Sequence, residues 1–366
     1  MAESKSDERL IVTLFEFAKV LFFIYIFLVS IDLMGMGFRY SGKEFTDTLF
    51  KMTSNPFIGL VIGIVVTSII QSSSTTTSII VAMVGAGAIP LKSAIPMVMG
   101  ANIGTTVTNT IVSFGYVGRK TEFERTFGVS IVHDMFNIYA TLVLFPIELY
   151  TGIIYKSALF LEKIFKDMGG FKFTSPLKII INPVSTPTVN FINNNHVLIF
   201  FALVLLFFSI TRIVKNMKGI VMEKIEMVLN QYLFRNAIIS ILFGIFFTAL
   251  VQSSSITTSI IIPLVGAGLL TMEQIFPYTL GANIGTTITA LLAALSVGKE
   301  AAMTIAICHL VFNVLGIFLF YPLRIIPIWT AKTIASYVSK SKKHFLIFLV
   351  IYILLHIIPI VFAKLY

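Results

Sequence analysis

A polar block occurs twice in this chain of 366 residues, and each copy interrupts an apolar stretch. The first copy reads Gln-Ser-Ser-Ser-Thr-Thr-Thr-Ser at 71–78, and the second reads Gln-Ser-Ser-Ser-Ile-Thr-Thr-Ser at 252–259. Each copy is followed by Gly-Ala-Asn-Ile-Gly-Thr-Thr, at 100–106 and 281–287, so both blocks recur at one offset of 181 residues. Two blocks repeated at the same spacing indicate a duplicated unit, with one copy in each half of the chain.

The composition places this duplicated unit in a membrane. Apolar residues make up 57% of the chain and charged residues only 12%, whereas soluble domains carry about 25% charged residues. Apolar runs near the ~20 residues needed to cross a bilayer predict transmembrane helices at roughly 10–36, 94–114, 127–149, 197–214, 276–297, 301–323 and 344–363. The net charge of +10 comes from basic residues in the loops between these runs, and this scatter argues against a nucleic-acid partner.

Four further apolar runs are too short to cross a bilayer. They form the pairs 57–70 with 75–89 and 237–251 with 256–270, and each pair is broken at the Gln-Ser-Ser-Ser sequence. A run of about 14 residues reads better as one arm of a re-entrant hairpin than as a span. Each half then crosses the membrane three times, so the second half enters upside down.

The predicted fold class is therefore an all-α polytopic membrane protein with inverted structural repeats, each containing a re-entrant helical hairpin and a discontinuous transmembrane helix. The predicted units are a first repeat at 1–150, an external inter-repeat loop at 151–195, a second inverted repeat at 196–323, and an interfacial segment with a final transmembrane helix at 324–366. Basic residues in the short loops favour a cytoplasmic N-terminus and an external C-terminus. This orientation predicts a multi-pass protein of the cell inner (plasma) membrane.

The hairpin tips carry the residue types of an ion site. Ser73, Ser74 and Thr75, with Ser254 and Ser255 in the second copy, are predicted N-caps of new half-helices. The start of a helix favours an anion, so two facing tips could hold an oxyanion without lysine or arginine. The Gly-Ala-Asn-Ile-Gly sequences are expected to unwind the following spans and to offer oxygens to sodium.

Other intramembrane polar residues have weaker patterns. Glu16 and Lys19 are expected to pair with each other on the first helix. His133 and His309 each precede an asparagine by four residues, which suggests either an interhelical hydrogen bond or a role near the ion site. Asp134 corresponds to Leu310 in the second copy, which argues against a place in a symmetric ion site.

These motifs resemble those of the type II sodium-dependent phosphate cotransporter family. The resemblance rests on both Gln-Ser-Ser-Ser blocks, both Gly-Ala-Asn-Ile-Gly blocks, the stretch EFERTFGVSIVHDMFN and the stretch CHLVFNVLGIFLFYP. It implies sodium-coupled uptake of inorganic phosphate, no enzyme activity, and no cofactor other than Na+ as coupling ion. It implies phosphate binding by Gln71, Ser72, Ser73, Ser74, Thr75, Gln252, Ser253, Ser254 and Ser255. The residues expected at sodium are Gln71, Asn102, Thr105, Thr106, Gln252, Ser255, Thr258, Asn283, Thr286 and Thr287.

Two alternatives stay open at this stage. The first is a sodium-coupled transporter of another small oxyanion, because helix starts and hydroxyl groups suit any tetrahedral anion. The second and more remote is an intramembrane serine hydrolase that pairs a serine of either block with His133 or His309. No Gly-x-Ser-x-Gly sequence supports the hydrolase. The resemblance suggests alternating access by an elevator-like motion, and at least two sodium ions are expected per phosphate dianion. Assembly into a homo-oligomer is left open by the sequence.

Overall fold

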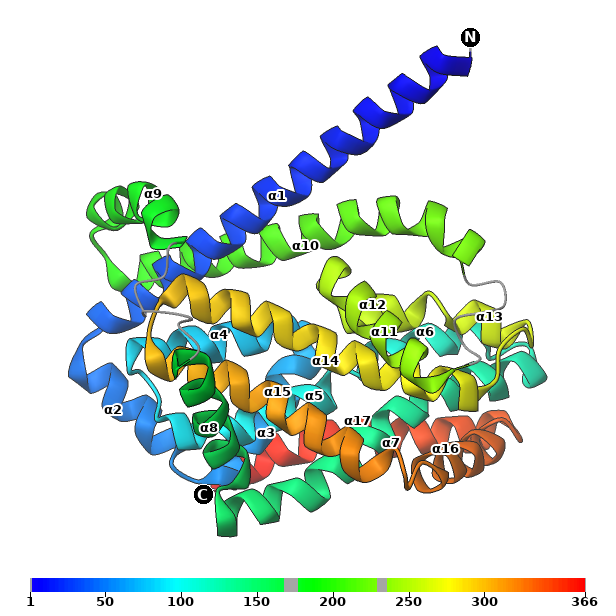
Figure 1. Ribbon diagram of the computed structural model, residues 1–366. Helices are drawn as coiled ribbons and strands as arrows, with labels where there is room; N and C mark the ends of the chain where they lie inside the picture. Colours follow the sequence, from blue (N-terminus) through cyan, green and yellow to red (C-terminus); the bar gives the residue numbers. More distant parts are fainter. Residues whose placement is uncertain (1, 168–176, 229–235, 366) are drawn as a thin grey trace.

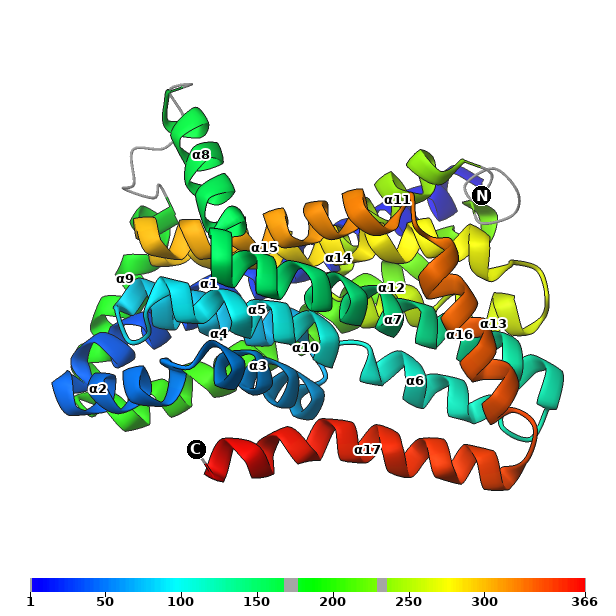
Figure 2. The same ribbon diagram turned by 90° about the horizontal axis from the view of Figure 1, so that it is seen from below.

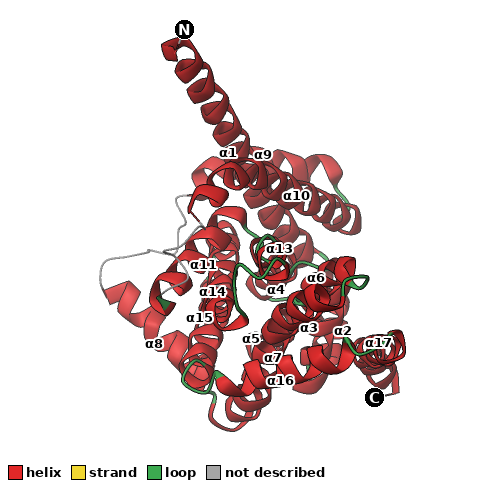
Figure 3. Ribbon diagram, turned by 90° about the vertical axis from the view of Figure 1, so that its right-hand side faces the viewer, coloured by secondary structure: helices red, strands yellow, loops and turns green. Residues whose placement is uncertain are grey.

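The structure is a computed structural model that describes residues 2–167, 177–228 and 236–365. The described residues form helices and short connections without a strand (Figure 1, Figure 3). The elements are α1 (Ala2–Tyr40), α2 (Gly42–Thr53), α3 (Pro56–Ile70), α4 (Ser73–Ala86), α5 (Leu91–Gly104), α6 (Val107–Ser113), η1 (Phe114–Tyr116), α7 (Lys120–Thr151), α8 (Ile153–Asp167), α9 (Leu177–Ile192), α10 (Asn195–Val228), α11 (Ala237–Val251), α12 (Ser254–Ser259), α13 (Ile262–Gly266), α14 (Met272–Val297), α15 (Glu300–Phe320), α16 (Ile325–Val338) and α17 (Lys342–Leu365).

Five of the described helices are long and apolar enough to cross a membrane. They cover Phe15–Tyr40, Lys120–Thr151, Asn195–Asn216, Met272–Val297 and Glu300–Phe320. Many of their outward side chains are apolar and exposed, for example Phe22, Leu142 and Phe318, as expected of surfaces that face lipid. Among these helices, α1 packs against α10, α14 packs against α15, and α7 contacts both α14 and α15. The two chain termini lie at opposite ends of the molecule (Figure 1). The prediction of a helical membrane protein is confirmed.

The two polar blocks each separate a pair of short helices. In the first copy, α3 ends at Ile70 and α4 begins at Ser73. In the second copy, α11 ends at Val251 and α12 begins at Ser254, followed by the short α13. Seen end-on, α4, α5 and α14 lie in the interior, while α1, α10 and α17 lie at the periphery (Figure 3). Most residues of both polar blocks are buried, whereas Gln71 is exposed.

Glycine residues bring the first helix of each short pair against the helix of the same copy that carries the Gly-Ala-Asn-Ile-Gly sequence. A Cβ atom on Gly63 of α3 would lie 2.0 Å from the carbonyl oxygen of Met97 in α5, and a Cβ atom on Gly100 would lie 2.1 Å from that of Leu60. The second copy repeats the arrangement, because a Cβ atom on Gly281 of α14 would lie 2.0 Å from the carbonyl oxygen of Ile241 in α11. Small residues at a spacing of four permit such backbone contact between membrane helices.

This close packing corrects one prediction. The second copy has no discontinuous span, because α14 runs unbroken from Met272 to Val297 through Gly281 and Gly285. Its glycines serve backbone contact with α11 rather than unwinding. In the first copy the helix does break, but after the glycine-rich block: α5 ends at Gly104 and α6 starts at Val107. The amide of Thr106 is 3.4 Å from the carbonyl oxygen of Ile103, a tighter turn than that of an α-helix.

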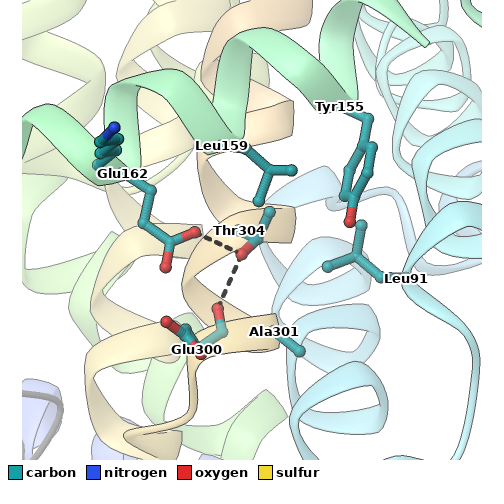
Figure 4. A pocket seen from close by; sticks show the side chains of 8 residues that line it. Leu91, Tyr155, Leu159, Glu162, Glu300, Ala301 and Thr304 are labelled. Carbon is teal, nitrogen blue, oxygen red and sulfur yellow. Dashed lines mark hydrogen bonds between the residues drawn. The ribbon is translucent and has the colours of Figure 1, made fainter.

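The segment predicted as the inter-repeat loop contains two helices that pack on the helical core. Glu148 accepts hydrogen bonds from the amides of Ile154 and Tyr155 and so caps the start of α8. Thr304 of α15 donates to Glu162 of α8 at 2.7 Å, beside a cavity of about 440 Å³ (Figure 4). No predicted site residue lines that cavity.

Two further helices complete the periphery. Helix α9 is attached to α1 through a 2.7 Å hydrogen bond from Ser185 to the buried Asp32. Helix α17 lies along α3 on the opposite side of the molecule (Figure 2). The expected pair on α1 is present, since Lys19 Nζ lies 2.6 Å from Glu16 Oε1.

Candidate ion and anion binding site

The glutamine of each polar block ends a helix in the left-handed conformation. Gln71 has φ 57° and Gln252 has φ 58°, and their amides donate to the carbonyl oxygens of Thr67 and Thr248. Among the described residues, only Asn193 is a further non-glycine residue with positive φ. A bulky residue in this conformation is uncommon and often marks a functional site. Both copies keep the same backbone turn at the same glutamine.

The serine that follows each glutamine caps the next helix. Ser72 and Ser253 are extended, and their Oγ atoms accept hydrogen bonds from the amides of Thr75 at 3.2 Å and Ile256 at 3.4 Å. The prediction that Ser73, Ser74, Thr75, Ser254 and Ser255 are N-caps was therefore wrong. The left-handed glutamine completes the reversal within one residue, so each new helix starts earlier than expected. Ser73, Ser74, Ser254 and Ser255 instead lie buried in the first turns.

The two polar blocks touch although they are far apart in sequence. The Ser74 hydroxyl donates to the backbone carbonyl oxygen of Gln252 at 3.0 Å, and both residues are buried. In the second copy, the Ser255 hydroxyl donates to the carbonyl oxygen of Thr105 at 3.3 Å, at the break between α5 and α6. The structure thus brings Ser74, Gln252, Ser255 and Thr105 into one polar region.

Next to this region lies a cluster of six buried residues, two histidines and four asparagines, which we call the asparagine–histidine cluster. His133 Nε2 lies 2.7 Å from Asn283 Oδ1, and His309 Nε2 lies 3.2 Å from Asn102 Oδ1. The Nδ2 atom of Asn283 donates to Asn137 at 2.7 Å, and that of Asn102 donates to Asn313 at 3.0 Å.

Two backbone contacts complete the asparagine–histidine cluster. Asn137 and Asn313 donate to the carbonyl oxygens of Asn102 and Asn283, at 3.0 and 3.3 Å. Each hydrogen bond between members of the cluster is therefore made by the equivalent residues of both copies. The cluster confirms the predicted interhelical hydrogen bonds of the two histidines.

The same bonds bear on the hydrolase alternative. Because an amide oxygen only accepts, each Nε2 atom carries its proton and donates to an asparagine. His133 Nδ1 lies 3.5 Å from Asn109 Nδ2, and His309 Nδ1 is buried with no hydrogen-bond partner among the described residues. Neither histidine is hydrogen-bonded to a serine of the polar blocks in these bonds, so the nucleophile–base pair of a serine hydrolase is not formed.

The threonines predicted at sodium are buried, and most bond within their own helix. The hydroxyls of Thr105, Thr106, Thr286 and Thr287 donate to carbonyl oxygens three or four residues earlier. A hydroxyl oxygen engaged in this way keeps lone pairs that can coordinate a cation. Asn102 and Asn283 lie in the asparagine–histidine cluster, where their side chains are already hydrogen-bonded.

Asn109 contacts the second polar block, and the sequence analysis missed it. Its amide group bonds to Thr258 at 2.7 and 3.0 Å, its Oδ1 accepts from Ser259 at 2.9 Å, and its carbonyl oxygen accepts from Ser130. The equivalent residue in the second copy is Ala290. The other candidate residues were identified because they occur in both copies. Asn109 occurs in only one copy, so duplication did not mark it.

The two glutamine side chains differ in their surroundings. Gln252 is 6% exposed and its Oε1 accepts a hydrogen bond from Thr289 at 2.6 Å, while its Nε2 contacts the carbonyl oxygen of Ala249. Gln71 is exposed. Thr75 donates to Ser72 at 2.9 Å, a bond that Ile256 cannot make in the second copy. The tips therefore share a backbone and differ in side-chain pairing.

Asp134 is also specific to the first copy. It is 3% exposed, and its Oδ2 atom lies 3.5 Å from the hydroxyls of Thr110 and Tyr352. Its Oδ1 atom has no hydrogen-bond partner among the described residues. The described residues hold no group of three histidine, cysteine, aspartate or glutamate side chains suited to a metal. The oxygen donors of the candidate site come mainly from hydroxyls, amides and backbone.

These features define the class of the protein: a polytopic helical membrane protein with a buried polar site built from two copies of one motif. A sequence profile of the family described as Na+/Pi-cotransporter matches residues 26–154 and 205–323. The chain belongs to this family.

Named relatives agree with this assignment. "Sodium-dependent phosphate transport protein 2A" of Ovis aries is 35% identical over 94% of this chain and 66% of the relative. The 2B protein of Homo sapiens is 31% identical over 91% of this chain and 63% of the relative. The chain spans about two thirds of the length of these relatives. No solved structure matches the chain.

Proposed function

We propose that this chain is a secondary active transporter that couples sodium entry to the uptake of inorganic phosphate by alternating access. The observation that carries the proposal is the contact between the two polar blocks, Ser74 Oγ to Gln252 O at 3.0 Å, in the buried centre of an apolar helical protein. The relatives named sodium-dependent phosphate transport proteins support the choice of both ions.

Phosphate is proposed to bind at the paired tips. The first N–H groups of a helix have no partner within that helix, and they lie at the positive end of its dipole. Helix α4 starts at Ser73 in this polar region, beside the hydroxyl groups of Ser72, Ser74 and Thr75. A bound phosphate would take over the protons that Ser74 and Thr75 donate to Gln252 and Ser72. The proposed phosphate ligands are Gln71, Ser72, Ser73, Ser74, Thr75, Gln252, Ser253, Ser254 and Ser255. None of them is basic, so binding depends on neutral donors that would release the dianion readily.

Sodium is proposed to bind next to the phosphate at the ends of α3 and α11 and along α5 and α14. The C-terminal end of a helix presents carbonyl oxygens and the negative end of the dipole, and both glutamines cap such ends. The proposed ligands are Gln71, Asn102, Thr105, Thr106, Gln252, Ser255, Thr258, Asn283, Thr286 and Thr287. This arrangement of half-helix ends and hydroxyls is the usual one for coupling ions in transporters with broken helices.

We further propose that the two halves are inverted repeats and that both short pairs are re-entrant hairpins. The matched bonds of the asparagine–histidine cluster support a two-fold relation between the halves. The opposite positions of the two chain ends agree with an odd number of crossings (Figure 1). The orientation with a cytoplasmic N-terminus and an external C-terminus in the cell membrane rests on the distribution of basic residues in short loops.

A free-energy comparison sets the proposed stoichiometry. One positive charge moving inward across ~100 mV releases about 2.3 kcal/mol, and a tenfold sodium gradient releases about 1.4 kcal/mol more. Inward movement of a phosphate dianion against the same potential costs about 4.6 kcal/mol. One sodium ion, at about 3.7 kcal/mol, is insufficient, whereas two support roughly 100-fold accumulation. We therefore propose at least two sodium ions per dianion.

The proposal is tested by counterflow of radiolabelled phosphate in proteoliposomes, with sodium, lithium or protons supplied in turn. The expected result is that labelled phosphate accumulates when sodium is present and does not accumulate with lithium or protons. Competition by sulfate or arsenate at equal concentration decides between phosphate and another small oxyanion. Uptake that is indifferent to sodium, or a sodium-to-dianion ratio of 1:1, contradicts the mechanism.

A further inference from the structure

The two hairpin tips have the same backbone but different hydroxyl pairing. In the second copy, Thr289 donates to the Gln252 side chain at 2.6 Å, and the hydroxyls of Thr248 and Thr257 are 2.8 Å apart. The equivalents of Thr248 and Thr289 in the first copy are Thr67 and Thr108. The Oγ1 atoms of Thr67 and Thr108 are buried and have no hydrogen-bond partner among the described residues. Two hydroxyls that are satisfied at one tip are thus unsatisfied at the other.

The backbone of the first tip is not responsible for this difference. Gln71 and Gln252 have φ of 57° and 58°, and their amides reach the threonine carbonyl oxygens at 2.6 and 2.7 Å. A Cβ atom on Gly104 would lie 2.7 Å from Thr67 Cβ, as a Cβ atom on Gly285 would lie 2.5 Å from Thr248 Cβ. Helix α3 therefore meets α5 as α11 meets α14. What changes is the side chain of Gln71, which is exposed, and the short break between Gly104 and Val107, directly before Thr108.

A buried hydroxyl without a partner is costly, and such groups are rare in folded proteins. Thr67 is 0% exposed, in the last turn of α3. The end of a helix carries unpaired carbonyl oxygens and the negative end of the dipole. Thr67 lies at this end of α3 and Thr108 lies in α6, and their equivalents Thr248 and Thr289 both contact Gln252 in the second copy. Two unpartnered hydroxyl oxygens and the amide oxygen of Gln71 form a set of ligands that suits a small hard cation.

We propose that Thr67 and Thr108, together with the side-chain oxygen of Gln71, coordinate a sodium ion at the first hairpin tip. The proposal rests on the proposed sodium-coupled transport and adds Thr67 and Thr108 to its ligands. In the second copy, the hydrogen bond from Thr289 occupies the Gln252 oxygen that would serve this purpose. The first tip thus binds its ion through two hydroxyls whose equivalents in the second tip are already paired, Thr289 with Gln252 and Thr248 with Thr257.

The test uses the isosteric variants Thr67→Val and Thr108→Val in the full chain. The sodium concentration that gives half-maximal phosphate uptake in proteoliposomes should rise about three- to tenfold, the effect of losing one oxygen ligand. The phosphate concentration for half-maximal uptake, measured at saturating sodium, should change less than about twofold. Thr108→Ser, which keeps the hydroxyl, should restore the sodium dependence of the unmodified chain.

Thr141→Val is the matched control. Thr141 of α7 also has a buried hydroxyl without a partner among the described residues, but it belongs to neither tip. This variant should keep the sodium dependence of the unmodified chain. If Thr67→Val and Thr108→Val also keep it, or if all three variants shift it equally, the proposed site is rejected.

A second measurement separates this site from the proposed function. Sodium binding to the purified protein without phosphate, followed by calorimetry with lithium and choline as comparison cations, does not depend on transport. The double variant Thr67→Val/Thr108→Val should lose one sodium ion per chain, and its unchanged helical signal and elution volume would show that it is folded. If the double variant loses this ion and the unmodified chain transports no phosphate, the site is supported and the proposed function is rejected. Full sodium binding by the folded double variant rejects the site.

Discussion

The asparagine–histidine cluster allows a prediction that compares two equivalent substitutions, one in each copy of the repeat. The change Asn283→Ala removes two hydrogen bonds of 2.7 Å, one with His133 and one with Asn137. The change Asn102→Ala removes two bonds of 3.2 and 3.0 Å, with His309 and Asn313. Each change leaves one imidazole N–H and one amide oxygen unpaired in a buried place.

The magnitude follows from these unpaired groups. A hydrogen bond inside a membrane protein contributes about 0.6 kcal/mol on average, but a buried group left without its partner costs about 1–3 kcal/mol. Two such groups lower the free energy of unfolding by about 2–6 kcal/mol, a large share of the roughly 5–15 kcal/mol of a typical protein. Because the bonds are equivalent, the two variants should agree within about 1 kcal/mol.

The assay is equilibrium unfolding in mixed micelles with increasing dodecyl sulfate, followed by the helical circular dichroism signal. Asn190→Ala, at an exposed position of α9, is the matched control and should change stability by no more than about 0.5 kcal/mol. If both cluster variants lose less than about 1 kcal/mol, the cluster does not stabilise the contact between the halves. If only one of them loses stability, the equivalence of the two copies is refuted.

Two further predictions concern the hairpins. In Gly63→Val, the new Cβ atom would lie 2.0 Å from the carbonyl oxygen of Met97, so α3 must separate from α5. We expect the free energy of unfolding to fall by more than about 3 kcal/mol and phosphate uptake to be lost. The control Gly115→Ala, whose new Cβ atom meets nothing within 4 Å, should leave both unchanged. Gln71→Ala and Gln252→Ala should each reduce sodium-dependent phosphate uptake while membrane insertion, measured by fractionation, stays normal; normal transport by both variants would show that the glutamines are not ligands.

The short helix pairs could be predicted from the sequence because two independent signals coincided. The apolar runs were too short to span a bilayer, and a polar block separated each pair, so the predicted arms at 57–70 and 237–251 agree with α3 and α11 to within one residue. The resemblance then supplied the family, which the sequence profile confirms.

The state of the second span could not be predicted by the same reasoning. Glycine lowers helix propensity, so Gly281 and Gly285 were interpreted as points of unwinding. In the structure they allow backbone contact with α11, and the helix is maintained. The spacing of four residues between them, repeated in α3 and α5, was the sequence signal for packing. The sequence does not show which helix packs against these glycines, because that depends on the tertiary structure.

Pairing between side chains was also beyond the sequence. Asn109 binds Thr258 and Ser259 across more than a hundred residues, and no duplication marks it. The N-caps lie earlier in the sequence than predicted because Gln71 and Gln252 adopt the left-handed conformation. The folded tip sets this conformation, and a glutamine in the sequence does not indicate it. The exposure of Gln71 and the burial of Gln252 likewise arise from neighbours that differ between the copies.

The glycine contacts described in the fold have a mechanical consequence. Where a missing Cβ atom lets one backbone lie against another, as at Gly63 and Gly281, the two helices interlock and cannot slide by a fraction of a turn without collision. If the backbone of either tip moves, α5 or α14 must therefore move with it. The smallest unit that can move as a rigid body is therefore α3 with α5, or α11 with α14. Sliding is left to helix surfaces without such glycine contacts.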